Sequence, residues 1–489
     1  MKTRRQPVER PFNHDYVDLT VVHRGDCHCY VQLRDRLPAD SRHFKVPHML
    51  AIRALSRPVR RVGTPAFLLL LAANALHADQ TVKFTVSAGQ HDRSNVPINV
   101  EFALESSLKD AHAALQDDAG NWYINQLTAP GLFAASAASN DSQGARELHF
   151  ILPDLKAGQS KQFTLTIPGH APISDEDGKP GNQFHWRDTP GEYDDLVFNN
   201  RPVLRYMYHA LDESSKESRF ATFKVFHHVF DPVTGNVLLT HTPDPLGYYP
   251  HHRGVFYGFY RATYDGNKTC DIWHCPAAFQ EHSAFLASEA GPVLGRQLLE
   301  INWFAEPKLE KGAKGDEPNA LFAKERRQLT AYNIPGGTLI DFASRLTPLL
   351  PPLHLDGDPQ HSGFHFRAAD DVHSKYVKQT YFLRPDGKGP LTEHADMGPQ
   401  GDETRNWDKD PAKRSPNTVN LPWDAMSFVL GDKRYTVAYL DNSRNPKESR
   451  GSERAYGRIG SYFVTDVTPE KPLDVNYRLW VQAGEMTVP

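Results

Sequence analysis

The chain has 489 residues, a formal net charge of −4, and 37 prolines and 33 glycines without a regular period. This length exceeds what one ordinary hydrophobic core serves, so we expect two domains, or one large β domain with an additional module. The composition excludes wholesale disorder and collagen-like structure, and the lack of an apolar run of about 18 residues excludes a protein that crosses the membrane several times.

The N-terminal region contains a pattern typical of a secretory signal peptide. Three arginines precede a short apolar run that starts at Pro65 and ends in Ala-Leu-His-Ala, which predicts cleavage after Ala78. Because such a signal begins near the initiator, Met49 is the predicted start, residues 49–78 are the predicted signal peptide, and residues 1–48 are predicted to be a mis-annotated upstream extension. A buried apolar helix in a genuine extension is the alternative. The predicted location is periplasmic or secreted.

Charge and cysteine content narrow the partners and the metal chemistry. Removing residues 1–78 takes away 13 of the 55 basic and 6 of the 59 acidic residues, which leaves a net charge of −11. An acidic chain argues against a nucleic-acid partner, since binding to phosphates needs a basic surface. Only Cys270 and Cys275 remain, so a four-cysteine zinc site is excluded, whereas a local disulfide and two buried thiols both stay open.

The first part of the mature chain predicts a small β-sandwich over residues 79–175. Apolar and polar residues alternate along its segments, as they do in half-buried strands, and turn residues separate them. The predicted strands are 81–87, 96–102, 148–152 and 162–167. The polar, turn-rich segment 174–182 is the predicted domain boundary.

The second part, residues 183–489, predicts a large antiparallel sandwich. It contains many strand-like segments joined by long loops, and it has no convincing amphipathic helix. The clearest strand-like segments are 254–260, 297–303, 326–332, 338–343, 435–440 and 473–481. The polar loop at 396–417 is long enough to form a lid or rim over a site.

One segment of this second part carries a family resemblance. Tyr249-Pro-His-His-Arg-Gly-Val-Phe256 resembles the hallmark of a bacterial family whose domain is labelled PmoA-like, or "methane oxygenase PmoA", and is otherwise of unknown function. The likeness covers residues 183–486. Further matching segments are 201–206, 271–273, 339–342, 363–368, 455–460 and 473–481.

The resemblance implies a fold more than an activity. The family is similar to galactose-mutarotase-like β-supersandwiches, which are frequent in carbohydrate-active proteins. The fold that we expect is therefore all-β, with a small N-terminal β-sandwich followed by a large antiparallel β-supersandwich. The methane monooxygenase subunit of the same name is a membrane protein with several spanning helices, so the label is a poor guide to activity, and fold does not fix function.

The candidate catalytic residues are histidines and one arginine at loop–strand junctions. His252 is the predicted general acid or base because imidazole titrates near pH 7, and Arg253 is predicted to orient a substrate through its planar guanidinium. His274 and His365 are predicted to line the same site. His251 is adjacent to His252 and would point to the opposite face if both lay on a strand.

The candidate substrate-binding residues come from two further segments. Residues two apart share one face of a strand, so the sequence predicts that His361, Gly363 and His365 line one side, with Arg367 continuing it, and that the small Gly363 leaves room for a ligand. Tyr456 and Arg458 lie in a glycine-punctuated segment that is typical either of a cleft edge or of an ordinary turn. The predicted binding set is His251, His361, Arg367, Tyr456 and Arg458.

These residues predict an exported carbohydrate-active enzyme that uses histidine acid/base chemistry, as a mutarotase, lyase or glycoside hydrolase. The partner would be a small-molecule or glycan substrate, with no nucleic acid and no transmembrane domain. A non-catalytic glycan-binding or envelope protein is one alternative. A metal-dependent oxygenase is another, with His252, His274 and His365 as conceivable ligands. No established metal-ligand spacing supports that set, so we expect no metal or other cofactor.

Overall fold

The computed structural model describes most of the chain beyond residue 79. The described residues are 18–24, 28–34, 80–105, 108, 112–138, 144–168, 182–307, 318–358, 360–385, 387–388, 396–397, 403–412, 414 and 418–486. The predicted signal peptide lies outside them, and so does most of the predicted boundary at 174–182. Within the described part, no helix is both long and apolar enough to cross a bilayer.

The predicted upstream extension is described only in two strands. These are β1 (Asp18–Arg24) and β2 (His28–Arg34), which pair with each other in antiparallel register. β2 also pairs in parallel with β3 (Gln80–Ser87). The proposal that residues 1–48 are no part of the protein stays a prediction.

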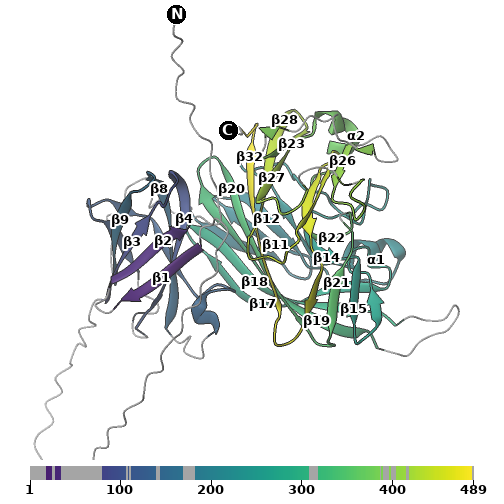
Figure 1. Cartoon of the computed structure of the whole chain (residues 1–489), viewed down its shortest axis with the longest axis horizontal. Helices are drawn as coiled ribbons and strands as arrows, with labels where there is room; N and C mark the ends of the chain where they lie inside the picture. The colour runs from purple at the N-terminus through teal and green to yellow at the C-terminus, as the bar shows by residue number, and fades with distance from the viewer. Residues whose placement is uncertain are drawn as a thin grey trace, which may run out of the picture.

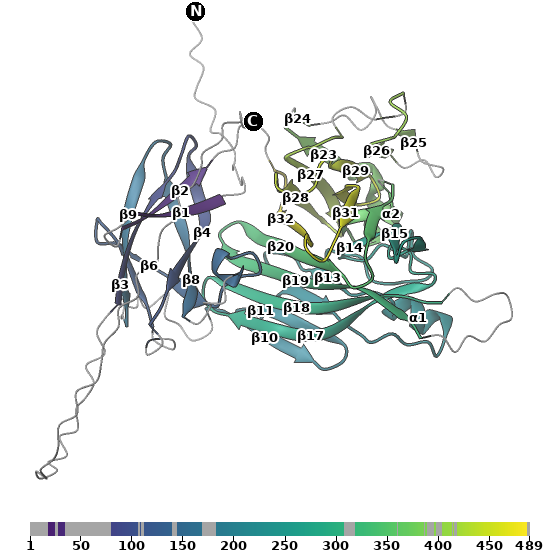
Figure 2. The same ribbon diagram turned by 60° about the horizontal axis from the view of Figure 1, so that its bottom comes forward.

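The described chain is almost entirely β-structure, which confirms the predicted all-β class. Five sheets account for it, and only two short α-helices accompany them, α1 (Lys216–Thr222) and α2 (Asp371–Tyr376). Figures 1 and 2 show a small sandwich beside a much larger body of long strands.

The small N-terminal sandwich packs a six-stranded sheet against a three-stranded one. The first sheet has the order β1-β2-β3-β9-β5-β6, and the second has the order β4-β8-β7. The new strands are β4 (Arg93–Ala103), β5 (Ala114–Asp117), β6 (Trp122–Tyr123), β7 (Asn125–Thr128), β8 (Ala145–Leu155) and β9 (Ser160–Ile167). Alternate residues point inward, so the rings of Phe84, Phe150 and Phe163 meet between the sheets, with centroids 5.0 to 6.1 Å apart.

The large domain is built on a ten-stranded and a nine-stranded sheet that share one hydrophobic core. The ten-stranded sheet contains, in spatial order, β10 (Phe184–Thr189), β11 (Tyr193–Phe198), β12 (Arg201–Met207), β13 (Phe226–Val229), β14 (Val255–Phe259), β22 (Ser362–Arg367), β30 (Arg458–Tyr462), β29 (Arg450–Arg454), β26 (Glu403–Asn406) and β25 (Asp396–Met397). Its inward residues Tyr257 and Phe364 pack against Trp303 and Phe342 of the other sheet, at ring distances of 5.9 Å for Tyr257–Trp303 and 4.3 Å for Phe342–Phe364.

The nine-stranded sheet closes the other side of this core. It contains, in spatial order, β17 (Ala278–Ala290), β18 (Leu294–Ala305), β19 (Ala320–Ile334), β20 (Gly337–Pro348), β32 (Leu473–Ala483), β28 (Lys433–Asp441), β27 (Trp423–Leu430), β23 (Tyr381–Arg384) and β24 (Gly387–Lys388). A four-stranded sheet of β16 (Lys268–Cys270), β15 (Arg261–Tyr264), β21 (Leu353–Asp356) and β31 (Thr465–Val467) flanks the two large sheets. The predicted sandwich is thereby confirmed.

The small sandwich lies beside one end of the nine-stranded sheet (Figures 1 and 2), and buried polar contacts join the two. The Gln126 side-chain oxygen accepts the backbone N–H groups of Val293, at 3.1 Å, and Leu294, at 3.0 Å. Arg296 of β18 donates to Glu147 of β8 at 2.6 Å. Both partners of this ion pair are almost fully buried, so the contact is part of the folded interior.

Candidate metal centre

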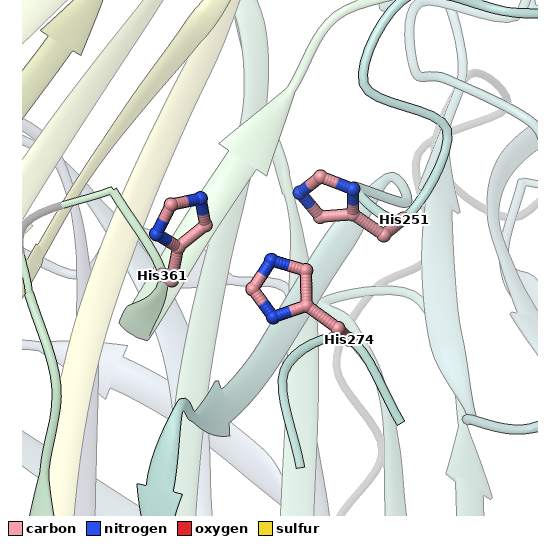
Figure 3. Close-up of side chains that lie close together, drawn as sticks. All are labelled: His251, His274 and His361. Atoms are coloured by element: carbon pink, nitrogen blue, oxygen red, sulfur yellow. The ribbon is translucent and has the colours of Figure 1, made fainter. Parts of the chain in front are cut away.

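Three histidines from three separate loops converge at one place in the large domain. His251 lies in the turn before β14, His274 lies between β16 and β17, and His361 immediately precedes β22. One ring nitrogen of each lies within 4.8 Å of those of the other two. Figure 3 shows the three rings facing a common point from three sides. Their centroids lie 4.5 Å apart for His251–His274, 4.7 Å for His274–His361 and 5.9 Å for His251–His361.

β14 and β22 are antiparallel neighbours, and their register sets Phe259 opposite Ser362, so His361 lies at the C-terminal end of β14. The Ile272 N–H donates to the carbonyl oxygen of Phe259 at 3.0 Å, which places the turn of His274 at the same end. His251 precedes the opposite end of β14, so its loop has to fold back over the sheet to reach the other two histidines. Gly254 is needed at the end of the first loop, since its φ is +44° and a Cβ there would collide with the carbonyl oxygen of His227 on β13. The loop therefore passes tightly against the sheet and brings the His251 ring over it.

Two of the three rings are each oriented by a carboxylate of their own. Nδ1 of His274 lies 2.8 Å from Oδ2 of Asp271, and Nδ1 of His361 lies 2.9 Å from Oδ1 of Asp358. When Nδ1 donates its proton to a carboxylate, the neutral imidazole keeps a lone pair on Nε2. Metal-binding histidines in proteins are usually oriented by this kind of second hydrogen bond. Both rings therefore present Nε2 as a possible ligand atom.

The third ring is neutral and has a buried nitrogen without a hydrogen-bond partner. Burial, together with the neighbouring His274 and Lys224, lowers the pKa of His251 to about 2. Its Nε2 atom is shielded from solvent and makes no hydrogen bond to any residue that the structure describes. Because buried polar atoms are nearly always satisfied, this nitrogen calls for a partner that the chain itself does not supply.

The centre is open to solvent on one side. The side chains of His274 and His361 are 30% and 26% exposed. The ring of Tyr260, which is 37% exposed, lies 5.6 Å from His274 and 6.0 Å from His361. Tyr260 and Asp271 also line a cavity of about 780 Å³ beside the four-stranded sheet. The cavity thus lies next to the partly exposed rings of His274 and His361, on the Tyr260 side.

The donor set fits a divalent transition-metal ion. Three neutral imidazoles with one open position form the ligand set of catalytic zinc sites, at a Zn–N distance of about 2.0–2.1 Å. Tetrahedral ligands at that distance lie about 3.3 Å apart, so the rings would have to move inward by roughly 1 Å from their present spacing. The rings of His274 and His361 are partly exposed and lie on loops, which leaves room for this movement.

The histidines that meet in the structure differ from the set His252, His274 and His365 that the sequence offered as conceivable metal ligands. His274 belongs to the centre, but His251 and His361 take the places expected for His252 and His365. His252 points from the turn into the interior, where its ring lies 5.6 Å from Trp273. His365 is completely buried, and its Nε2 lies 2.7 Å from the carbonyl oxygen of Ser362. The catalytic roles of His252 and His365 stay predictions.

The predicted arginines lie in the interior below the centre. Arg253 donates to the carbonyl oxygens of Phe220 and, at 3.1 Å, Ala221. Arg367 and Arg458 are likewise fully buried. The predicted orienting role of Arg253 and the binding roles of Arg367 and Arg458 stay predictions, because these side chains reach main-chain carbonyls rather than the open side.

Tyr456 and Gly363 lie in surroundings that differ from those expected from the sequence. Tyr456 is almost fully buried and packs against Tyr248, Tyr249 and the ring of His252, so it does not form a cleft edge. Gly363 has a φ of +94°, and a Cβ there would collide with the carbonyl oxygen of Ser461 on β30. The expectation that Gly363 leaves room for a ligand is therefore wrong, because the adjacent strand fills that room.

Three residues of the centre were missed, although the sequence contains a signal for two of them. Asp271 and Asp358 each stand three residues before their histidine, so Asp-x-x-His occurs twice at the site. Lys224 is the third. Its ammonium donates to the carbonyl oxygen of Trp273 and lies 3.4 Å from that of His251, so it ties together two of the histidine loops. A lysine within the apolar run Phe-Lys-Val-Phe was its only signal.

Comparison with known proteins identifies the family. The chain belongs to a family of unknown function (DUF6807), whose model matches residues 195–488 and so includes all three histidines. That description names no activity, and the resemblance to the PmoA-like family stays a prediction. No curated protein matches the chain.

Solved structures show only weak likenesses. A glycosyl hydrolase family 38 protein from Enterococcus faecalis is 11% identical, with a TM-score of 0.34 over 81% of this chain and 43% of that chain. An α-mannosidase from Enterococcus faecalis V583 is 10% identical, with a TM-score of 0.38 over 83% and 43%. A galactose mutarotase related enzyme from Lactobacillus acidophilus is 8% identical, with a TM-score of 0.18 over 62% and 98%. The chain spans less than half the length of the first two, and likenesses this weak carry no argument about activity.

Proposed function

We propose that this protein is a metal-dependent enzyme whose centre is formed by His251, His274 and His361. The observation that carries the proposal is the convergence of three imidazole nitrogens within 4.8 Å at a partly exposed place. Two of the rings are held by carboxylates, and the third has a buried nitrogen without a partner. Zn²⁺ is the ion that best suits three neutral imidazoles and one free position.

The residues of the centre divide into ligands and supports. A divalent ion at this place would act as a Lewis acid toward an oxygen atom of the substrate. Asp271 and Asp358 keep two ligand rings in the required tautomer and orientation. Lys224 holds the backbones of the loops that carry His251 and His274.

A carbohydrate is the proposed substrate class. Sugars offer hydroxyl and carbonyl oxygens to a Lewis acid, and their C–H faces stack on aromatic rings. Tyr260 presents such a ring beside the open side of the centre. Reactions of this kind include the isomerisation, elimination and hydrolysis of sugars. The proposed periplasmic or secreted location still rests on the predicted signal peptide alone.

Metal analysis of the purified protein tests the centre. We expect close to one equivalent of Zn²⁺ per chain, and a Co²⁺-substituted form with the intense visible absorption of tetrahedral coordination. His274→Ala and His361→Ala should each weaken metal binding by about 100-fold or more, since three ligands define the site. Copper or iron as the resident metal would favour the oxygenase alternative instead.

A surface histidine provides the matched control. Nδ1 of His354 lies 2.7 Å from Asp466, which is the same His–Asp pairing without other histidines around it. His354→Ala should leave metal content unchanged. Equal metal affinity in the parent protein and in His274→Ala would overturn the metal centre. Stoichiometric metal without turnover of any sugar or glycan would instead favour the glycan-binding alternative.

A further inference from the structure

Four cationic side chains are buried beneath and around the histidine centre. They are Lys224, Arg253, Arg367 and Arg458, which we call the cation group. Lys224 reaches the carbonyl oxygen of His251 at 3.4 Å. Arg458 donates to the carbonyl oxygen of Gln360, the residue before His361, at 2.5 Å. The group thus supports the loops of the centre from the inside.

The partners of the cation group are mostly uncharged. Arg253 and Lys224 donate to main-chain carbonyls, and Arg458 donates to a carbonyl and to the Ser452 hydroxyl. Of these four cations, only Arg367 forms an ion pair with a residue that the structure describes, and its partner is Asp370 at 3.2 Å. The Nε–H groups of all three arginines are buried and have no hydrogen-bond partner among those same residues.

This pattern differs from that of two other buried arginines in the large domain. Buried charges are normally paired with an opposite charge, because an unpaired charge in the interior is costly. Elsewhere in the large domain, Arg327 is paired with Glu325 at 2.8 Å, and Arg384 donates to Glu453 at 2.7 Å. Lys224, Arg253 and Arg458 lack such a carboxylate partner among the described residues.

The charge balance at the centre is positive. The four cations face three carboxylates, those of Asp271, Asp358 and Asp370, so one positive charge is left over. A divalent ion on the histidines would raise the excess by two further charges. An interior of this kind attracts a negatively charged ligand, and the low dielectric around it strengthens the attraction.

We infer that the substrate of this centre is an anionic sugar, whose negative group binds toward the metal and offsets the excess charge of the cation group. The inference rests on the proposed metal centre. The buried cations act through their field and through the loops that they hold, because their side chains do not reach the open side. A carboxylate, a sulfate or a phosphate group can supply the negative charge.

The unmodified protein provides the first test. Co²⁺-loaded protein is titrated with D-galacturonate, with its uncharged methyl ester and with D-galactose, while the visible absorption of the ion is followed. We expect galacturonate to bind on the order of tenfold or more tightly than the ester, which has nearly the same shape but no charge. Equal binding of acid and ester overturns the inference.

Simple anions complete this test. Acetate, sulfate and phosphate are added separately to the Co²⁺ form, and their relative affinities show which anionic group the centre prefers. If galacturonate and all three anions leave the spectrum unchanged at millimolar concentration, the inference is wrong even though the metal centre stands. If Co²⁺ does not bind at all, the proposed function fails first, so the two failures are distinguishable.

Charge-removing variants locate the source of the field. Lys224→Met and Arg458→Gln each remove one positive charge, and the second keeps a donor for the Gln360 carbonyl. We expect each to lose on the order of tenfold in affinity for galacturonate and little for the ester. Lys375→Met is the control, since Lys375 is an exposed lysine on α2 paired with Asp371 at 2.7 Å. An equal loss for the acid and its ester in both variants contradicts a charge effect.

Discussion

Two of the regions in which this protein buries arginines satisfy the buried charge differently. At the contact between the small sandwich and the large domain, Arg296 faces Glu147 at 2.6 Å and Glu289 at 2.7 Å. Beneath the histidine centre, Arg253 and Arg458 face carbonyl and hydroxyl oxygens instead. In the first region, carboxylates of the chain itself neutralise the buried arginine, so this ion-pair network stabilises the fold. The second keeps an excess of positive charge, which is the property of an interior that supports a ligand site.

The largest effect should come from breaking the paired region. Arg296→Met leaves the buried carboxylate of Glu147 without its cation, and stranding a buried charge costs about 4 kcal/mol. We expect urea denaturation to show a loss of this size in the free energy of unfolding. A loss below about 1 kcal/mol would mean that the Arg296–Glu147 pair does not stabilise the fold, and the contrast between the two regions would fail.

The pH dependence of the paired region sharpens the comparison. Burial alone would raise the pKa of Glu147, but His149 and Arg296 together lower it to about 2, from an ordinary value of 4.5. A carboxyl group with a lowered pKa stabilises the fold above its unfolded pKa, and that contribution is lost as the pH falls toward the folded pKa. Glu147→Gln should therefore cost on the order of 3 kcal/mol at pH 7 and progressively less from pH 4.5 down to pH 2.

Thermal unfolding of the parent and of Glu147→Gln between pH 2 and pH 7 measures this dependence. The gap between the two melting temperatures should narrow as the pH falls. A gap that is constant over the whole range would show that the charge of Glu147 contributes nothing, and that only its shape matters.

The smallest effect should come from the unpaired region. Arg458→Met strands no carboxylate, because Arg458 donates to Gln360 and Ser452 rather than to an acid. The expected loss is that of the hydrogen bonds to Gln360 and Ser452 and of a long 3.4 Å contact with Nδ1 of His365, about 1–2 kcal/mol in total. Guanidinium denaturation of this variant beside Arg296→Met gives the comparison directly. Equal losses in the two variants would indicate that Arg458 has a charged partner at this place.

Much of the fold could be predicted because strand patterns are local. The alternation in Gln162-Phe-Thr-Leu-Thr-Ile167 places Phe163, Leu165 and Ile167 in the core, as the structure shows. Side chains of a strand alternate between its two faces, so a few residues suffice to reveal the period. The prediction of a small sandwich followed by a larger one is confirmed for this reason.

The site could be predicted only in part. The Pro-His-His-Arg-Gly segment and His274 each contribute a ring to the histidine cluster, but the sequence does not show which of two adjacent histidines faces it. The segment forms a turn instead of a strand, and His251 faces the centre while His252 points inward. The repeated Asp-x-x-His spacing at 271–274 and 358–361 was the stronger local signal, since it marks rings that are already held by a carboxylate.

Local chemistry in the sequence determined the β-rich class, the loops that could carry function and the residue types able to bind a metal. Only the tertiary structure decided that His251, His274 and His361 meet. Strand pairing and a backbone hydrogen bond bring His361 and the turn of His274 to the end of β14, and the loop before β14 folds back over the sheet to carry His251 there. The tertiary structure also decided that four cations share one interior with few acids. Burial and charge balance depend on neighbours that are distant along the chain, and no local pattern records them.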